Sequence, residues 1–272
     1  VALHFSSTHL SWLHCMWGIG ASLGPYIMGY ALTGGLSWNS GYRYIAVLQI
    51  GLTVVLFFSL PLWRGQTKIA RKTEAADTKA APIPLRHVVM IPGAKEIMIT
   101  FFCYCAVEQT ANLWASSYLV LHRGVSAETA AGFASLFFVG ITAGRFLSGF
   151  LTLLLNDTQM IRLGQGLIAV GIITLLLPFG TITSLAGLLL IGLGCAPVYP
   201  SIIHATPANF GEDKSQAMIG VQMASAYAGT CLMPPVFGLV ANHLGISLLP
   251  FYLMLILIVM VFMHERMFFK IQ

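Results

Sequence analysis

Two charged residues, Glu108 and Arg145, lie deep inside long apolar stretches of the sequence. A charge at the centre of a bilayer costs on the order of 2.5–3.5 kcal/mol on insertion scales, so such residues should face protein or water and should be paired. The two residues fall at similar depths in neighbouring stretches, which allows an ion pair between them. This pair would either line a solute cavity or act as a latch that breaks during transport. The alternative is a static buried pair that fixes the register of two helices.

Two amide side chains accompany Glu108. Asn112 lies one helical turn further along the same face, and Gln109 is the next residue. Polar side chains in an apolar helix are expected to face a cavity or another helix rather than lipid. They offer the hydrogen-bond donors and acceptors that a hydroxyl-rich solute needs. Hydrogen bonding between helices is the alternative, and it requires no solute.

Prolines mark the expected hinges. Pro197 and Pro200 interrupt one apolar stretch, because each removes an amide donor and clashes with the carbonyl four residues earlier. Carbonyls freed in this way must meet protein or a water-filled cavity. Tyr199, between the two prolines, could present its hydroxyl there. The other hinge candidates are Gly24, Pro25 and Pro234.

Three further polar residues are candidates for the translocation pathway. Gln222 and Tyr227 share one apolar stretch, but they are five residues apart and so do not share one helical face well. His14 is a candidate as well, although a lone histidine in a helix is more often a structural donor. The five cysteines all fall in apolar stretches and show neither zinc-ligand spacing nor a disulfide framework, so we expect no metal and no cofactor.

Eight long apolar stretches must position these residues. Hydrophobic residues make up 57% of the chain, charged residues only 8%, and the mean hydropathy is +0.82, which is typical of a membrane protein. A hydrocarbon core about 30 Å thick requires roughly 20 apolar residues per helix. The sequence therefore predicts an all-α integral membrane protein. Its expected spans are residues 10–33, 43–63, 95–121, 129–154, 160–180, 184–206, 215–241 and 245–268.

A basic, hydrophilic loop at residues 64–94 separates the second span from the third. It carries six lysines and arginines against two acidic residues, so the positive-inside rule places it in the cytoplasm. Since short connections make the spans alternate, both chain ends are then cytoplasmic too, and we expect the inner membrane of a bacterium. The net charge of +5 thus indicates orientation and not nucleic-acid binding.

Several motifs resemble the major facilitator superfamily, and within it the fucose–proton symporter-like branch. The motifs are residues 12–25, residues 104–108 with Trp114 and Tyr118, residues 144–149, and residues 192–200. The resemblance implies twelve helices in two bundles, of which this chain would supply about eight. Residues 1–63 would form the last two helices of the N-terminal bundle, 64–94 the cytoplasmic linker and 95–272 the six-helix C-terminal bundle. Val1 and the residues after it are typical of the tail of an earlier helix, so we expect a chain truncated at its N-terminus.

The same resemblance implies a secondary active transporter and not an enzyme. It would move a small polar solute, with a sugar as the favoured class, by alternating access, and protons are the candidate coupling ion of the full-length form. We expect a monomer whose partners are the solute and the lipid bilayer, with no nucleic acid. No proton-coupling residue can be assigned, because the acidic residues of that branch lie on helices that this chain lacks. The alternative is a transport-inactive fragment or a sensor-like protein derived from a transporter.

Overall fold

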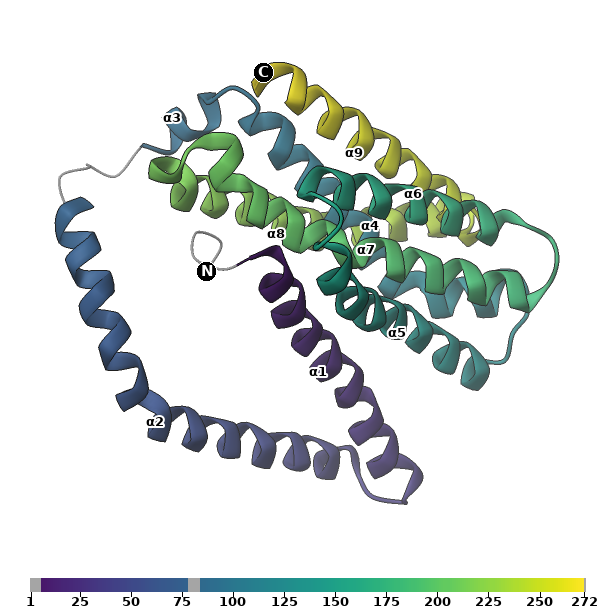
Figure 1. The fold of residues 1–272 in the computed structure, drawn as a ribbon. Helices are drawn as coiled ribbons and strands as arrows, with labels where there is room; N and C mark the ends of the chain where they lie inside the picture. The colour runs from purple at the N-terminus through teal and green to yellow at the C-terminus, as the bar shows by residue number, and fades with distance from the viewer. Residues whose placement is uncertain (1–5, 78–83, 272) are drawn as a thin grey trace. The chain divides into compact units, whose positions relative to one another are not determined.

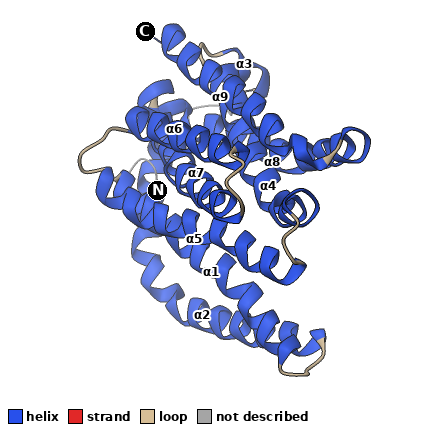
Figure 2. Ribbon diagram, turned by 90° about the vertical axis from the view of Figure 1, so that its right-hand side faces the viewer, coloured by secondary structure: helices blue, strands red, loops and turns tan. Residues whose placement is uncertain are grey.

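Every regular element of the structure is helical (Figure 2). The computed structural model describes residues 6–77 and 84–271. Eight of its helices have 20 residues or more, and each overlaps one expected span. They are α1 (Ser7–Thr33), α2 (Trp38–Asp77), α4 (Ala94–Arg123), α5 (Ala127–Leu151), α6 (Asp157–Leu176), α7 (Thr181–Phe210), α8 (Glu212–Leu244) and α9 (Leu249–Ile271). Two short elements, α3 (Leu85–Met90) and η1 (Ile246–Leu248), precede α4 and α9. The all-α fold class is confirmed.

Five segments of the described chain are long and apolar enough to cross a membrane by length and composition. They are Trp38–Pro61 of α2, the whole of α6, α7 and α8, and Ile246–Ile271, which joins η1 to α9. A shorter apolar segment, Leu136–Leu151, lies in α5. α4 is not among them, because Glu108, Gln109 and Asn112 lower its hydropathy. The helix that carries Glu108, Gln109 and Asn112 is thus one that length and apolarity alone do not select.

The basic segment that follows Arg64 is not a loop from its start, which corrects the prediction. α2 continues as a helix to Asp77, and α3 lies within the same expected linker. The reason is composition, since lysine, arginine, glutamine, glutamate and alanine all favour helix even where the segment is too polar for a bilayer. α2 also bends part-way along its length in Figure 1. Pro61 lies inside α2, and a proline there removes one backbone hydrogen bond.

The described chain divides into two compact units, one of residues 1–19 and 84–272 and one of residues 20–83. In the first unit, α4, α6 and α8 run in one direction and α5, α7 and α9 in the other (Figure 1). α7 has the most extensive packing, with α6 on one side and α5 on another, while α4 packs against α8 and α9. The core of this unit therefore lies along α7 and α4.

Glycines allow α7 to approach its two neighbours closely. A Cβ atom at Gly194 would lie 2.6 Å from the amide nitrogen of Ile168 on α6, and one at Gly192 would lie 2.3 Å from the carbonyl oxygen of Phe137 on α5. Likewise, a Cβ atom at Gly164 on α6 would lie 2.5 Å from the carbonyl oxygen of Gly194. Helices in membranes often associate through small residues, which allow close van der Waals packing. The hydrophobic effect does not drive this association, because lipid tails are as apolar as the helices.

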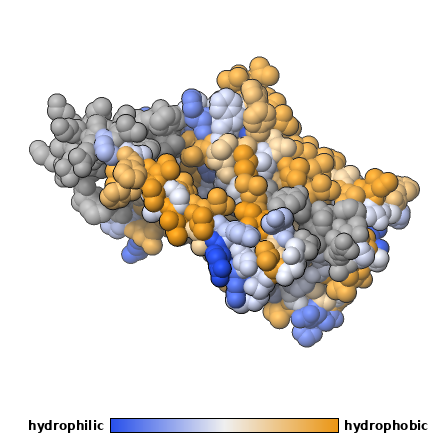
Figure 3. All heavy atoms as spheres, turned by 90° about the horizontal axis from the view of Figure 1, so that it is seen from below, coloured by the Kyte–Doolittle hydropathy of each residue, from blue (hydrophilic) through white to orange (hydrophobic). Residues whose placement is uncertain are grey.

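Apolar side chains cover much of the described surface on the face seen in Figure 3. Large hydrophobic side chains such as Leu154 and Phe269 are exposed. Soluble monomers rarely expose contiguous apolar patches larger than a few hundred Å². Together with the apolar helices, this surface is that of an integral membrane protein.

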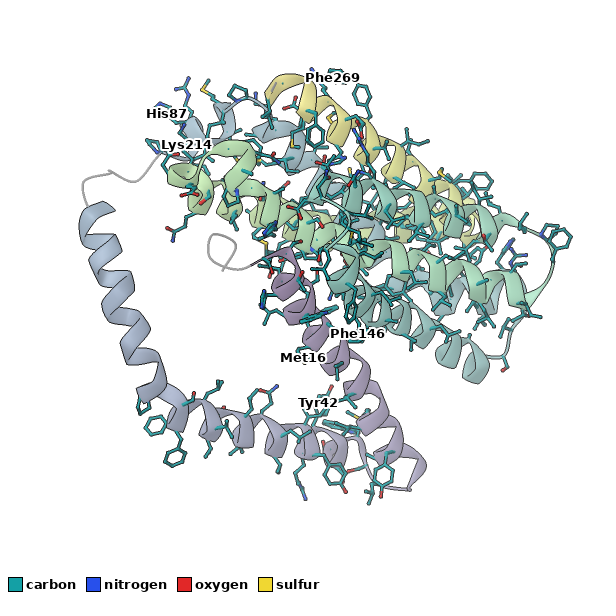
Figure 4. The ribbon with its side chains drawn as sticks, viewed as in Figure 1. Met16, Tyr42, His87, Phe146, Lys214 and Phe269 are labelled. Carbon is teal, nitrogen blue, oxygen red and sulfur yellow. The ribbon has the colours of Figure 1, made fainter. Side chains whose placement is uncertain are left out.

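Ion pairs gather at one end of the bundle, which we call the basic end. Arg162 on α6 binds Glu265 on α9 through two bonds of 2.7 and 2.6 Å. Glu96 at the start of α4 lies 2.6 Å from the Lys270 ammonium and 3.6 Å from the Arg266 guanidinium, both on α9. Figure 4 labels His87, Lys214 and Phe269 at this end. At the opposite end, Arg123 donates hydrogen bonds to the carbonyls of Leu175, in the last turn of α6, and of Leu177, its C-cap.

Candidate functional site

The structure brings Glu108 on α4 and Arg145 on α5 together, as the sequence predicts. Nη2 of Arg145 lies 3.9 Å from Oε1 of Glu108. The Arg145 side chain is 4% exposed and that of Glu108 16% exposed, so the carboxylate reaches the accessible side of the pair. This separation is that of an ion pair, but it is longer than the 2.7–2.9 Å or so of a charge-assisted hydrogen bond. Whether the pair lines a transport pathway stays a prediction.

α1 completes the surroundings of Arg145. Nη1 of Arg145 donates a hydrogen bond of 3.2 Å to the carbonyl oxygen of His14, and the guanidinium lies 4.6 Å from the centre of the Trp17 ring. Nε is buried and has no hydrogen-bond partner among the described residues. A cation over an indole face is favourable by about 0.5–2 kcal/mol, which offsets part of the cost of burying the charge.

The first turns of α1 hold this position because small residues meet α5. A Cβ at Gly18 would lie 2.5 Å from Oγ1 of Thr142, and one at Gly149 would lie 2.0 Å from the Trp12 indole nitrogen. The Trp12 ring also contacts that of Phe150 edge-on at 5.6 Å. Figure 4 labels Met16 on α1 and Phe146 on α5, where these helices run side by side. Close approach of the two backbones is what places His14 and Trp17 over Arg145.

An aromatic cluster lies beside the ion pair. The Tyr199 ring on α7 lies 4.9 Å from the His14 ring, 4.9 Å from the Phe101 ring and 6.3 Å from the Tyr104 ring. The Tyr104 hydroxyl is buried without a partner among the described residues. Tyr104 is also one helical turn before Glu108 on the same face of α4. The cluster therefore joins α1, α4 and α7 around one point.

Tyr227 lies on the face of α8 that meets this cluster, whereas Gln222 does not. The Tyr199 hydroxyl contacts Sδ of Met223 on α8 at 3.1 Å, and Tyr227 is one turn beyond Met223 on the same face. Tyr227 is 62% exposed. Gln222 is fully buried between α7 and α8, where its Oε1 accepts a hydrogen bond of 3.0 Å from Thr206. The two residues thus lie on different faces of α8, as their spacing predicts.

The two amide side chains on α4, Gln109 and Asn112, bond to each other within the helix. Nδ2 of Asn112 donates a hydrogen bond of 3.4 Å to Oε1 of Gln109, and both side chains are partly exposed. Within the part of the chain that the structure describes, Asn112 therefore does not link α4 to another helix. Both amides keep capacity for further hydrogen bonds, which agrees with an open site next to Glu108.

His14 is held by its own helix. Its Nδ1 lies 2.8 Å from the carbonyl oxygen of Leu10, one turn earlier. The structural role that is usual for a lone histidine is thus present, together with the ring contact to Tyr199. His14 supplies Arg145 with a backbone carbonyl and the aromatic cluster with a ring.

The hinge candidates have different surroundings. Pro197 and Pro200 are buried within α7, which continues as one helix through both. Pro234 lies in α8, and its carbonyl accepts a hydrogen bond of 3.1 Å from the Trp114 indole. Trp114 is thereby a tie between α4 and α8. A Cβ at Gly24 would meet open space, and the Pro25 side chain lies outside the described residues.

A second polar network was not predicted from the sequence. His204 on α7 lies 2.6 Å from the Asp157 carboxylate on α6, and that carboxylate accepts a hydrogen bond of 3.0 Å from Ser7 on α1. Asp157 follows Asn156, whose side chain caps α6, so the sequence indicated only a turn. Trp17 and Tyr104 were not among the predicted site residues either. Their spacing could have identified them, because Trp17 is one turn after His14 and Tyr104 is one turn before Glu108.

The groups gathered here have the chemistry that suits a polar solute. No group of three histidine, cysteine, aspartate or glutamate residues in the described ranges could hold a metal ion. What the site offers is one buried cation, one partly exposed carboxylate, two amides and several aromatic rings. Such a mixture of a few placed polar groups and aromatic walls is typical of small-molecule sites.

Comparisons with known proteins agree with this fold. The family model of the Major Facilitator Superfamily matches residues 5–210 of the 272. Among solved structures, a variant of the E. coli fucose:proton symporter FucP gives a TM-score of 0.57 at 19% identity, over 68% of this chain and 44% of that one. FucP in the outward conformation gives 0.53 at 17% identity, over 65% and 42%. A variant of the peptide transporter POT in complex with sulfate gives 0.55 at 19% identity, over 68% and 42%.

These structures share the fold with this chain at low identity, and the chain spans less than half of their length. Comparison with curated protein sequences gives no match. The family model covers well over half of the chain, from α1 through α7. The chain therefore belongs to the major facilitator superfamily of membrane transporters.

Proposed function

We propose that the protein is a secondary active transporter of a small polar solute, with a sugar as the favoured class. The observation that carries the proposal is the buried Arg145 beside the partly exposed Glu108, walled by aromatic rings. A buried ion pair in a membrane bundle is costly and is expected where a solute or ion passes. The names of two solved relatives, a fucose:proton symporter and a peptide transporter, support polar cargo and protons as the coupling ion.

Alternating access is the proposed mechanism. In this scheme residues 1–63 belong to one bundle, residues 64–94 link the bundles and residues 95–272 form the other, with the solute between them. The Glu108–Arg145 pair lines that site or opens as a latch when the bundles rock. The remaining pathway residues of the proposal are Gln109, Asn112, Tyr199, Gln222, Tyr227 and His14, with hinges at Gly24, Pro25, Pro197, Pro200 and Pro234.

The proposed location is the inner membrane of a bacterium, with the linker and both chain ends in the cytoplasm. The gathering of Arg162, Arg266 and Lys270 at the basic end supports this orientation. The protein is proposed to act as a monomer.

Uptake into proteoliposomes tests the proposal. We expect time-dependent accumulation of a labelled monosaccharide, with fucose in the panel, that rises with an inward proton gradient and is abolished by a protonophore. Arg145→Gln should reduce uptake about tenfold or more, since it removes the buried charge of the site. Arg266→Gln is the matched control, because Lys270 still pairs with Glu96. Uptake that is equal in Arg145→Gln and in the unchanged protein would exclude this site.

The second candidate is a sensor-like or transport-inactive protein that binds solute without moving it. A buried Arg145 beside a partly exposed Glu108 would serve such binding as well as transport. Saturable binding without accumulation in the same vesicles would select this candidate.

A further inference from the structure

The guanidinium of Arg145 has unused hydrogen-bonding capacity. An arginine carries five N–H donors in a fixed fork. Among the described residues, the hydrogen bond of Arg145 is the one that Nη1 donates to the His14 carbonyl, and Nε has none. Nη2 faces Glu108 at 3.9 Å, beyond hydrogen-bond length. A buried cation in this state is costly and is expected to have a further acceptor in some state of the protein.

A second arginine in the same protein shows what a closed pair looks like. Arg162 binds both carboxylate oxygens of Glu265, at 2.7 and 2.6 Å, although its side chain is 53% exposed. Arg145 is far more buried, and its pair with Glu108 would gain more from close contact in a low dielectric. The Glu108 carboxylate accepts no hydrogen bond from another described residue, and the side chain is 16% exposed. The guanidinium of Arg145 is therefore held in place by His14 and Trp17 of α1, and it makes no bidentate pair with Glu108.

We infer that Arg145 is the recognition site for a carboxylate on the solute, and that the solute is a hydroxylated carboxylate of the sugar-acid class. This inference rests on the proposed function and specifies its substrate. A planar carboxylate can take two parallel bonds from the fork, which an ammonium or amide site could not offer. Gln109 and Asn112, together with the unpartnered hydroxyl of Tyr104, supply donors and acceptors for the solute's hydroxyl groups.

Glu108 then acts as the competitor of the solute. Two carboxylates cannot both use one fork, so the solute displaces Glu108 when it binds, and Glu108 favours release when it approaches Arg145 again. Trp17 and the His14 carbonyl hold the guanidinium in place in both states. The Glu108–Arg145 distance of 3.9 Å is what such an exchange requires, since a closed bidentate pair would exclude the solute.

Binding of glucuronate and of glucose to the protein in lipid nanodiscs tests the inference. The two probes differ by a carboxylate in place of a hydroxymethyl group, and binding is measured by calorimetry and by the intrinsic tryptophan fluorescence of the protein. We expect glucuronate to bind about tenfold or more tightly than glucose, as a bidentate charged pair should provide. Glu108→Gln should raise the ratio of the two affinities further, because it removes the competing charge.

Variants of Arg145 separate charge from shape. Arg145→Gln should abolish the preference for glucuronate, and Arg145→Lys, which keeps the charge without the fork, should retain only part of it. Arg266→Gln is the control for a lost arginine charge and should keep the full preference. Equal affinity for the two probes, or a preference that survives Arg145→Gln, would overturn the inference and leave the proposed function in place. Absence of both binding and uptake for every solute would overturn the two together.

Discussion

At the scale of single residues, two arginine–carboxylate pairs of this protein differ in burial and in geometry. The exposed pair of Arg162 and Glu265 has closed geometry, yet surface pairs contribute only about 0–1 kcal/mol to stability. The buried pair of Arg145 and Glu108 is open, at 3.9 Å, and buried pairs are weak evidence of stability in themselves. In our proposal the open pair is the one that carries function, because its unused donors can meet a solute.

A double-mutant cycle measures this difference. For Glu108→Gln and Arg145→Gln we expect a coupling free energy of about 1 kcal/mol, because the low dielectric compensates for the long distance. The measurement is the free energy of unfolding of the four variants in detergent. The cycle for Arg162→Gln and Glu265→Gln is the reference, with about 0.5 kcal/mol expected at a largely exposed pair. A coupling near zero for the buried pair would mean that Glu108 and Arg145 do not interact.

At the scale of elements, α7 is the helix around which the first unit is built. It packs against α5 and α6 through glycines such as Gly192 and Gly194, where an added Cβ atom would lie 2.3 and 2.6 Å from the backbone of the neighbouring helix. Its prolines remain inside one continuous helix because this close packing confines it on both sides. Tyr199 owes its position next to His14 and Tyr104 to this arrangement.

Two glycines on α6 provide a matched test of that packing. A Cβ at Gly164 would lie 2.5 Å from the carbonyl oxygen of Gly194, while one at Gly166 would meet nothing within 4 Å. Gly164→Ala should therefore destabilise the protein by about 1–3 kcal/mol through overpacking. Gly166→Ala should be neutral or stabilising by up to about 1 kcal/mol, since alanine favours helix. Thermal unfolding in detergent checks both, and equal midpoints would refute the close contact of α6 with α7.

At the scale of the whole molecule, the exposed apolar side chains and the charged helix ends are those expected of a protein in a bilayer. Exposed apolar side chains cover the sides of the helices, while Arg162, Glu265 and Lys270 gather at one end of the bundle and Arg123 lies at the other. The solvent of the helix sides is lipid, and water is available only at the two ends. Orientation in the membrane is then decided by the basic residues.

Single cysteines test the orientation. Arg86→Cys lies on α3 at the basic end, and Phe179→Cys lies in the connection between α6 and α7, where Phe179 is 73% exposed. In a background with Cys231→Ser, which removes the exposed native thiol, a membrane-impermeant maleimide should label Phe179→Cys in intact cells. Arg86→Cys should react only after permeabilisation. The opposite pattern would invert the proposed topology.

Local chemistry made much of the fold predictable from sequence. The eight helices follow from runs of about 20 apolar residues, because a bilayer leaves no other way to satisfy the backbone. The meeting of Glu108 and Arg145 followed as well, since two buried charges at similar depth need each other. The end of α2 at Asp77 could not be predicted from the sequence, because a polar segment can leave the membrane and still remain helical.

The sequence by itself determined the membrane class, the helices and the identity of the charged pair, since these depend on composition and on spacing along one helix. The tertiary structure decided which partners each side chain has. It placed Trp17 against Arg145 and bound His204 to Asp157. It also buried Gln222 at the interface of α7 and α8, and it brought Met223 of α8 against the hydroxyl of Tyr199. Such contacts join residues far apart in the chain, and they depend on which faces of two helices meet. That choice is set by close packing at glycines such as Gly18, and no local pattern encodes it.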